Sequence, residues 1–411
     1  MSRLLAISCI CIMIVSGTAL GDDSELVVKP YGFILTNFQF NDNIKADIPT
    51  VAVLSDTTAN TVLTARQTRF GLTMSMEERG WKMGGKIELD FWGLKGFGKN
   101  GGAMQSAPRL RLAYFQIGRN KISMVFGQDW VCFAPLSPES DAHVSIPGFS
   151  SSGNLWNRMP QIRLDYKRAS EKSSVLAQLA IVRPLASDKD PSTEYKQSDL
   201  FGAGEVNKLP FLQTRLALAL DPKITVGVSG HFGQEDFETA NADTLISDKT
   251  TTYAAAIDAK AGLGNVTFMG EGFFGANLIT LFSNASWFRE PTGTGNNFKY
   301  EPTKAMGGWG SIGYKVGGSP VLFNIGAGIE IINDEQIDTI ATRDPDAAKF
   351  SKNFTVFGNV LYSPFTKIRL GMEIGYIKSS YKTYNSDAAV LAIEEEDASN
   401  LSINLSAKFS F

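Results

Sequence analysis

The chain has 411 residues, a formal net charge of −3, 43% hydrophobic residues and a mean hydropathy of −0.06. This composition excludes a bundle of transmembrane helices, because no window after the first 21 residues approaches the ~18 consecutive apolar residues that such a helix needs. It does not exclude a membrane β-barrel, in which only alternate residues of each strand face lipid. The slightly negative charge gives no indication of a nucleic-acid partner.

The first 21 residues differ from the rest of the chain. Arg3 is followed by an apolar run over residues 4–15, and then by small residues that place Ala19 and Gly21 at the −3 and −1 positions of a cleavage site. This pattern predicts a secretory signal peptide at 1–21, cut after Gly21, and a single mature domain at 22–411. The alternative, a membrane anchor, is disfavoured because the apolar run is too short to cross a bilayer.

From residue 29 onward the chain reads as strands in which apolar and polar residues alternate, as they do when one face of a sheet meets lipid. In the second strand, for example, Leu72 and Met74 fall on one face, and Thr73 and Ser75 fall on the other. An even number of strands is typical of single-chain bacterial barrels. The sixteen predicted strands are 29–41, 66–78, 81–91, 108–118, 121–133, 160–168, 173–183, 211–220, 223–233, 250–262, 266–276, 304–316, 321–332, 352–362, 367–378 and 400–411.

The connections between these strands fall into two classes that alternate strictly. Seven are tight turns rich in Gly, Pro, Asn and Asp, and eight are long. Outer-membrane barrels show this asymmetry, with short turns inside and long loops outside. The rival fold, a soluble protein of two β-sandwiches, explains neither the asymmetry nor the signal peptide. The long loops are 42–65, 95–107, 134–157, 184–209, 234–248, 279–303, 333–350 and 379–396.

The terminal strand, 400–411, alternates without a break and ends the chain on Phe411. A last strand needs a neighbour at both edges, or it becomes a site of aggregation, and a closed barrel supplies both. The ending also resembles the C-terminal strand of Gram-negative outer-membrane barrels, where a terminal Phe is the assembly signal. We therefore expect an all-β protein, a sixteen-stranded antiparallel transmembrane β-barrel of the outer-membrane porin type. Its lipid face is expected to carry Leu72, Met74, Leu164, Ile325, Leu370 and Leu405, and its inner interface Tyr166, Tyr314, Tyr362 and Phe411.

Signals for an enzyme are weak. His143 follows Ser140 and Asp141, which permits a Ser-His-Asp arrangement, but a polar loop residue is the simpler interpretation because nothing in a loop fixes base, orienting acid and nucleophile together. Cys132 is the only cysteine of the mature chain, so no intrachain disulfide is expected. No Cys/His spacing indicates a metal site, and no cofactor is expected. The acidic run 394–397 permits calcium contacts, although a solvated loop end is the simpler interpretation.

Arginines on the strands that descend from the long loops are more informative. By alternation their side chains face the lumen in the outer half of the barrel, together with several acids. Rings of Arg or Lys make a pore prefer anions, whereas Arg–acid pairs brace the wall, and the two roles are compatible. If the arginines select, Arg109→Ala with Arg111→Ala should lower the anion-to-cation permeability ratio without unfolding the barrel. The residues predicted to line the pore and set its selectivity are Arg69, Arg109, Arg111, Arg163, Arg215, Glu88, Asp90 and Asp129.

Five motifs between residues 66 and 163 resemble the DcaP-like porins in sequence and order. They are 66–72 (RQTRFGL), 85–93 (GKIELDFWG), 108–114 (PRLRLAY), 127–130 (GQDW) and 158–163 (RMPQIR). The resemblance implies a sixteen-stranded homotrimeric barrel that admits small anionic solutes such as dicarboxylates and lines its constriction with the arginines of these motifs. Some relatives carry an N-terminal coiled coil. Residues 22–28 leave no room for one here, so a trimer would be held by the barrel walls alone.

The third long loop, 134–157, is the candidate for narrowing the pore, because a barrel this wide leaves an aqueous channel unless something constricts it. It either folds into the lumen, as the third loop does in many porins, or remains an ordinary surface loop. The sequence thus predicts a non-enzymatic diffusion channel for small hydrophilic solutes, preferring anions, in the lipid bilayer of the bacterial outer membrane. Two alternatives stay open: a barrel enzyme built around His143, and a plugged barrel that serves adhesion or structure.

Overall fold

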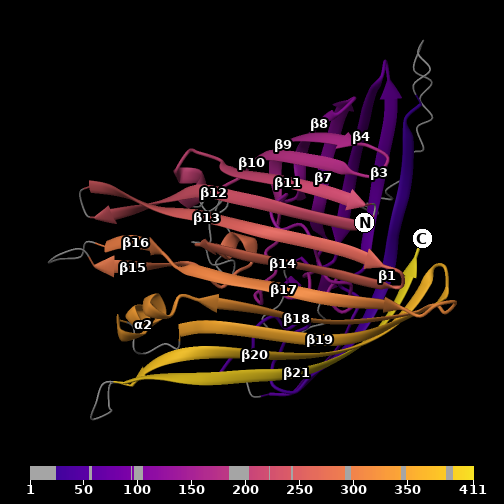
Figure 1. Cartoon of the computed structure of the whole chain (residues 1–411). Coiled ribbons are helices and arrows are strands. Elements are labelled where there is room, and N and C mark those ends of the chain that lie inside the picture. Colours follow the sequence, from indigo (N-terminus) through magenta and orange to yellow (C-terminus); the bar gives the residue numbers. More distant parts are fainter. Residues whose placement is uncertain are drawn as a thin grey trace, which may run out of the picture.

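The computed structural model describes residues 25–54, 58–93, 95–96, 105–184, 203–221, 223–241, 244–291, 298–343, 349–385 and 392–411. The predicted signal peptide at 1–21 lies outside these residues. Within them, sixteen antiparallel strands close into one barrel, as the alternation predicted (Figure 1). Each wall strand pairs with its neighbours in chain order, and the first pairs with the last, which closes the wall.

Tight turns join the strands at one end of the barrel, and the longer connections lie at the other (Figure 1). We refer to these as the tight-turn end and the long-loop end. The wall strands are β1 (Val27–Asn41), β3 (Arg69–Glu78), β4 (Trp81–Asp90), β7 (Arg109–Arg119), β8 (Ile122–Trp130), β9 (Arg158–Ala169), β10 (Ser174–Val182), β11 (Phe211–Asp221), β12 (Ile224–Asn241), β13 (Thr244–Leu263), β14 (Val266–Ala276), β17 (Lys304–Lys315), β18 (Val321–Ile332), β19 (Lys349–Phe365), β20 (Ile368–Asn385) and β21 (Ala392–Ser410).

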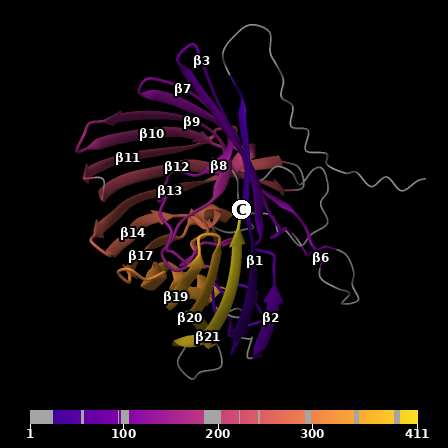
Figure 2. The ribbon, with the colours of Figure 1, turned by 90° about the vertical axis from the view of Figure 1, so that its right-hand side faces the viewer.

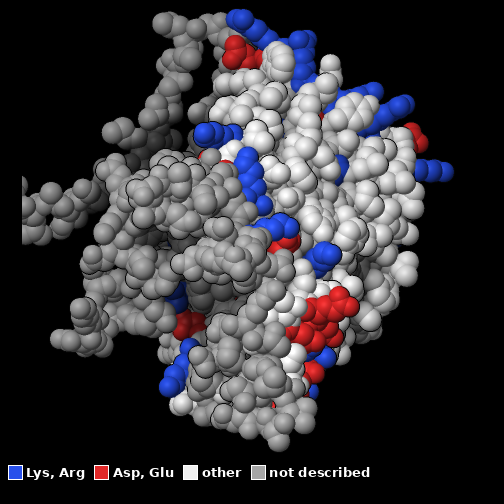
Figure 3. Space-filling view, turned by 90° about the vertical axis from the view of Figure 1, so that its left-hand side faces the viewer, with Lys and Arg blue, Asp and Glu red and all other residues white. Residues whose placement is uncertain are grey.

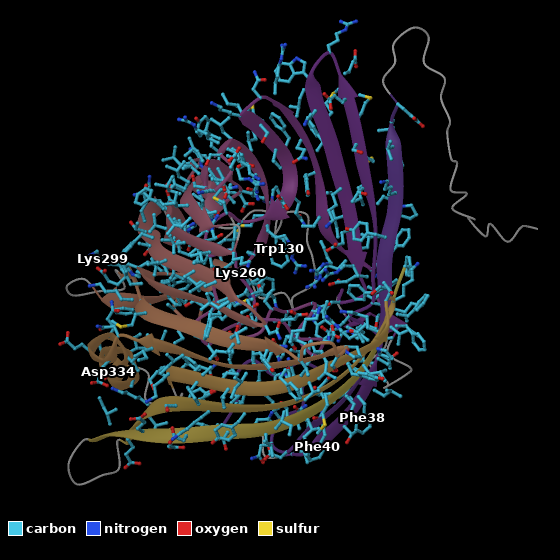
Figure 4. All side chains as sticks on the ribbon, turned by 45° about the vertical axis from the view of Figure 1, so that its right-hand side comes forward. Phe38, Phe40, Trp130, Lys260, Lys299 and Asp334 are labelled. Carbon is cyan, nitrogen blue, oxygen red and sulfur yellow. The ribbon has the colours of Figure 1, made fainter. Side chains whose placement is uncertain are left out.

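The two faces of the wall differ in chemistry. Outward-facing residues such as Leu164 and Ile325 are exposed, as lipid contact requires. Inward-facing residues are largely polar and hydrogen-bond across strands, as where Asn324 of β18 donates to Asn359 of β19 at 2.8 Å. The alternation in the sequence therefore distinguishes lumen from lipid. Other exposed outward residues include Phe38, seen on the outer side of the wall in Figure 4, and Tyr166, Tyr314, Tyr362, Leu370, Leu405 and Phe411.

The tight turns have the backbone geometry that their residue types predict. Arg79 and Gly80, between β3 and β4, both have positive φ, at 50° and 74°. Two such residues let a two-residue turn follow the right-handed twist of the strands it joins. Asn120, Gly264 and Gly318 supply positive φ at three other turns.

Several strands of the second half are longer than predicted. β12 and β13 run through the predicted loop 234–248, and β20 and β21 run through much of 379–396. A strand needs only ~9–11 residues to cross a bilayer, so these strands continue beyond it. There neither face meets lipid, so the apolar alternation ends in the sequence while backbone pairing goes on. In the first half the reverse occurs, and the strand predicted at 121–133 ends at Trp130.

The remaining elements lie in the segments at the long-loop end. β2 pairs with residues 37–41 of β1, near the long-loop end, while β5 pairs with β6 and β15 with β16. No helix of the described residues is long and apolar enough to span a membrane. These elements are β2 (Asn60–Thr64), β5 (Lys95–Gly96), β6 (Gln105–Ser106), β15 (Trp287–Pro291), β16 (Phe298–Pro302), α1 (Ala203–Val206), α2 (Asp334–Arg343) and the 3₁₀ turn η2 (Ile279–Leu281).

The seam between β1 and β21 joins the two ends of the chain (Figure 2). The backbone N–H of Phe411 donates to the carbonyl oxygen of Gly32 at 3.1 Å. The Phe411 ring lies directly over Gly32, where an added Cβ would come within 2.8 Å of the ring atom Cζ. The terminal aromatic therefore packs on the first strand at a position that only glycine leaves open.

Candidate functional site

The loop between β8 and β9, residues 131–157 and hereafter loop 3, folds into the barrel. The Asp141 carboxylate accepts hydrogen bonds from Arg369 Nε of β20 and Lys408 Nζ of β21, both at 2.6 Å. Its backbone carbonyl accepts one from Asn37 Nδ2 of β1 at 2.9 Å. These three partners are inward-facing residues on the far side of the lumen. Of the two interpretations that the sequence left open, the inward fold is the one found.

A second set of contacts fixes loop 3 against the wall formed by β17 to β19. The Phe149 ring lies 5.7 Å from the Trp309 ring and 5.2 Å from the Phe357 ring, measured between centroids. Gly153 has φ of +104°, and a Cβ on it would lie 2.3 Å from the carbonyl oxygen of Gly308. The loop backbone thus rests directly on the wall, which requires glycine at this position.

The two ends of loop 3 are buried in an apolar cluster at the long-loop end of the lumen. Phe133 and Leu155 pack there with Phe211 of β11 and Leu281 of η2. Cys132 belongs to the same cluster, where burial raises the pKa of its thiol to about 11. The thiol therefore stays protonated at neutral pH.

Three of the five predicted arginines meet two of the predicted acids in one cluster, which we call the arginine patch: Arg69, Arg109, Arg111, Glu88 and Asp90. Arg111 donates Nε to Glu88 and Nη1 to Asp90, each at 2.8 Å. Arg109 binds both Asp90 oxygens, at 2.7 and 3.0 Å. Arg69 Nε lies 3.4 Å from Glu88 Oε1. The patch is thus a network of ion pairs facing the lumen.

A β-bulge brings Arg111 into the patch. The pairing of β4 with β7 shifts by one residue, so that Leu110 faces Leu89 while Leu112 faces Glu88. Arg111 is the extra residue between them, and its side chain is only 1% exposed, against 29% for Arg109. Bulges re-aim side chains in this way. Simple alternation predicts that both arginines face inward, but not that one of them is fully enclosed.

The other two predicted arginines stay apart from the patch. Arg163 of β9 binds Asp129 and Asp165, each at 3.0 Å. Arg215 of β11 binds Asp258 of β13 at 2.7 Å. Each of these arginines forms ion pairs with its own carboxylates. This is the wall-bracing role that the sequence analysis gave as one of two possibilities. The predicted five-arginine wall is therefore three separate groups.

Loop 3 contacts the arginine patch through its backbone. Arg69 Nη2 donates to the carbonyl of Val144 at 3.1 Å, and Arg109 Nη2 donates to that of Ser145 at 3.3 Å. The Ser145 hydroxyl donates to Asp90 at 3.0 Å. The patch and loop 3 therefore contact each other inside the lumen.

Arg158, the first residue of β9, belongs beside this patch. Alternation along the strand did not place it on the lumen face, whereas the motif resemblance included it among the arginines of the constriction. Its guanidinium lies 5.0 Å from the Trp130 ring and 5.3 Å from the Trp156 ring. Arg111 approaches the same Trp130 ring at 5.8 Å. Arg158 Nη1 is buried and has no hydrogen-bond partner in the part of the chain that the structure describes. The signal in the sequence is the pair of tryptophans that flank loop 3.

The charges around the patch do not cancel. Lys86 Nζ lies 3.5 Å from Glu88, and Arg158 stacks beside Arg111, so five cations stand against the two carboxylates of Glu88 and Asp90. Trp130 marks this region among the side chains that fill the interior in Figure 4. This part of the lumen therefore carries excess positive charge.

His143 lies in loop 3 but does not form a Ser-His-Asp triad with Ser140 and Asp141. The Ser140 hydroxyl donates to Glu373 at 2.6 Å rather than to the imidazole. His143 Nε2 lies 3.6 Å from the other oxygen of Glu373, while Asp141 binds Arg369 and Lys408. Among the described residues no group of three or more His, Cys, Asp or Glu side chains is arranged to hold a metal.

We expect mild acid to loosen loop 3 through His143. Burial lowers the pKa of His143, with Glu373 opposing that shift, so the inserted loop binds the proton less readily than a released one. The stability of the inserted state is therefore fully present above pH ~6.5 and falls as the pH drops below that value, by at most ~1.4 kcal/mol per pH unit. Single-channel recordings between pH 7.5 and 5 should show increasing current noise, and His143→Gln should remove that increase. Equal noise in both proteins would contradict this assignment.

Comparison with known proteins adds to these observations. No family model and no curated protein sequence matches the chain. Solved structures do match. The outer membrane channel DcaP of Acinetobacter baumannii superimposes with a TM-score of 0.70 over 94% of this chain and 97% of its own, at 19% identity.

The chain has the fold of an outer-membrane porin. OmpT of Vibrio cholerae matches over 94% of this chain and 98% of its own, at 12% identity and a TM-score of 0.54. OprB of Pseudomonas putida matches over 93% and 94%, at 10% identity and a TM-score of 0.50. The predicted likeness to DcaP is confirmed at the level of the fold.

Proposed function

We propose that this protein is a passive diffusion channel of the bacterial outer membrane for small hydrophilic solutes, preferring small anions such as dicarboxylates. We further propose that residues 1–21 are removed on export and that the mature barrel, 22–411, works as a homotrimer. The observation that carries the proposal is loop 3, which crosses the lumen beside a cluster of five cations and two carboxylates.

The preference for anions has its physical basis in the short distance between the cations and a passing ion. Charges inside a narrow passage of lower effective dielectric act strongly on a passing ion, whereas the acids of the long loops are screened by salt beyond ~8–10 Å. Arginine also offers two parallel donors to a carboxylate. Arg158 is the group best placed to do so, because Nη1 has no partner in the described residues and its guanidinium lies against two indole rings.

We expect the wild-type channel to prefer anions in a salt gradient across a planar bilayer, and Arg158→Gln to reduce that preference at least about twofold. Among the described residues no acid forms an ion pair with Arg158, so the change reports on selectivity rather than on folding. Arg119→Gln is the matched control, since Arg119 stacks on the exposed Trp81 at the other end of the barrel. A wild type that prefers cations would show that the arginines only brace the wall.

The homotrimer is supported by the porin fold and by one relative, OmpT of Vibrio cholerae, which is described in a trimer form. Cross-linking in native membranes tests it: a monomer-only pattern would refute the trimer and leave the channel proposal intact. Hydrolytic activity lost in His143→Ala would favour a barrel enzyme instead, and absence of conductance would favour a plugged barrel.

A further inference from the structure

A second group of cations faces the lumen at the tight-turn end, far from the arginine patch. It consists of five lysines on five different wall strands, each within four residues of the tight-turn end of its strand. All are solvent-exposed. We call this group the lysine ring: Lys29 (β1), Lys82 (β4), Lys167 (β9), Lys260 (β13) and Lys315 (β17).

The strand registers place these side chains on the lumen face. On β13, Lys260 has the same parity as Asp258, which binds a lumen arginine, while Ile257 has the opposite parity and is 60% exposed on the lipid side. On β9, Lys167 has the parity of Arg163, whose carboxylate partners lie in the lumen. Alternation then fixes the direction of each lysine. Lys260 is labelled in Figure 4.

Four of the five members of the lysine ring have no acid paired opposite them. None of its five members forms an ion pair with any acid in the described part of the chain. Of the residues paired with them across the strands, only Glu77, opposite Lys82, is acidic; the others include Thr73, Leu176 and Thr225. The long-loop end differs, since acidic side chains gather on part of the face shown in Figure 3.

Distance separates the lysine ring from the arginine patch. On β4, Lys82 precedes Asp90 by eight residues, which corresponds to roughly 25 Å along the strand. That exceeds the screening length of ~8–10 Å at physiological salt, so the two groups act on a solute independently. The lysine ring therefore adds a positive field at the opposite mouth rather than enlarging the constriction.

We propose that the lysine ring is a second, non-stereospecific selectivity filter at the tight-turn mouth, acting on small anions with carboxylate or phosphate groups. The proposal rests on the channel function proposed above. Lysine suits the role because its ammonium is a compact, hydrated point charge that holds no fixed geometry, so the ring acts through its field rather than by tight binding. Exposed lysines of one sign around a mouth raise the local concentration of anions.

Reversal potentials across planar bilayers test this with potassium chloride and with potassium phosphate gradients. Replacing all five lysines by Gln should lower the anion-to-cation permeability ratio at least about threefold at 0.1 M salt, and the loss should largely vanish at 1 M, where the screening length is ~3 Å. Lys167→Glu alone should shift the ratio in the same direction. Arg168→Gln is the matched control, because it removes one charge from the next residue of β9, on the lipid face, and should change nothing.

The outcomes separate the two proposals. An anion-selective wild type whose five-lysine variant and Lys167→Glu variant keep the wild-type ratio at 0.1 M salt overturns the lysine ring and leaves the channel function standing. A wild type that does not conduct, or that prefers cations, overturns the proposed function and the ring with it. Gel mobility of the unheated barrel confirms that each variant is folded.

Discussion

Replacing Arg111 by Ala is expected to destabilise the barrel by about 3–5 kcal/mol, because it leaves two enclosed carboxylates without their shared partner. Arg111 is the only one of the described residues that binds both Glu88 and Asp90 directly, and all three side chains are almost completely buried. Arg109→Ala should cost only ~1 kcal/mol, since Arg109 is partly exposed and Asp90 keeps its bond to Arg111. Denaturant unfolding in detergent micelles measures both.

A compensated variant distinguishes charge from packing in the Arg111 result. Adding Glu88→Gln and Asp90→Asn to Arg111→Ala neutralises the two carboxylates that have lost this partner, so part of the lost stability should return. Equal losses for Arg111→Ala and Arg109→Ala would contradict the structural role assigned to Arg111. If Arg111→Ala unfolds the barrel locally, the selectivity of the double variant Arg109→Ala with Arg111→Ala cannot be interpreted. Arg158→Gln is therefore the better test of selectivity.

Replacing Asp141 by Asn is expected to release loop 3 from the far wall and to raise the single-channel conductance. Asn has the same shape but no charge, so Arg369 and Lys408 lose their common carboxylate while the backbone bond from Asn37 remains possible. Breaking such a largely enclosed group costs about 3–5 kcal/mol. Two uncovered cations should also strengthen anion preference. Conductance and reversal potential in bilayers report the two effects.

The control for Asp141 is Asp397→Asn, which breaks an ion pair with Lys378 in which both side chains are nearly half exposed. That change should leave conductance unaltered, and an identical current from Asp141→Asn would refute the role of Asp141. Burial alone would raise the pKa of Asp141, but hydrogen bonds and charges from Arg369 and Lys408 outweigh it and hold the pKa below 3.8. The stability from this carboxylate is present above pH ~3.9 and lost only below it, so acid should mimic the substitution only in that range.

The strands of the wall could be predicted from the sequence, but the contacts among side chains inside the lumen could not. Lipid contact imposes a strict rule on every second residue, so the strands and the direction of residues such as Leu164 and Arg163 could be predicted from alternation alone. Alternation ends where the strands leave the bilayer, so the sequence pattern predicts loops at the extensions of β12, β13, β20 and β21.

The candidate site depends on contacts between distant segments, which alternation does not encode. Nothing local in loop 3 shows that Asp141 meets Arg369, or that Phe149 packs on Trp309. The one-residue bulge at Arg111 changes burial without changing residue type. Alternation did not place Arg158 beside the patch, because its setting is made by two tryptophans at opposite ends of loop 3.

The attachment of loop 3 links completion of the wall to narrowing of the passage. Asp141 bridges β20, β21 and β1, and so spans the seam where the first and last strands of the chain meet. Contacts between residues this far apart in sequence form late in folding, because the intervening chain must be ordered first. Loop 3 cannot complete its attachment before β21 has joined β1, so a barrel still lacking its last strand has neither a closed wall nor a fixed constriction. Assembly thus closes the wall and fixes loop 3 across the lumen together, as its final event.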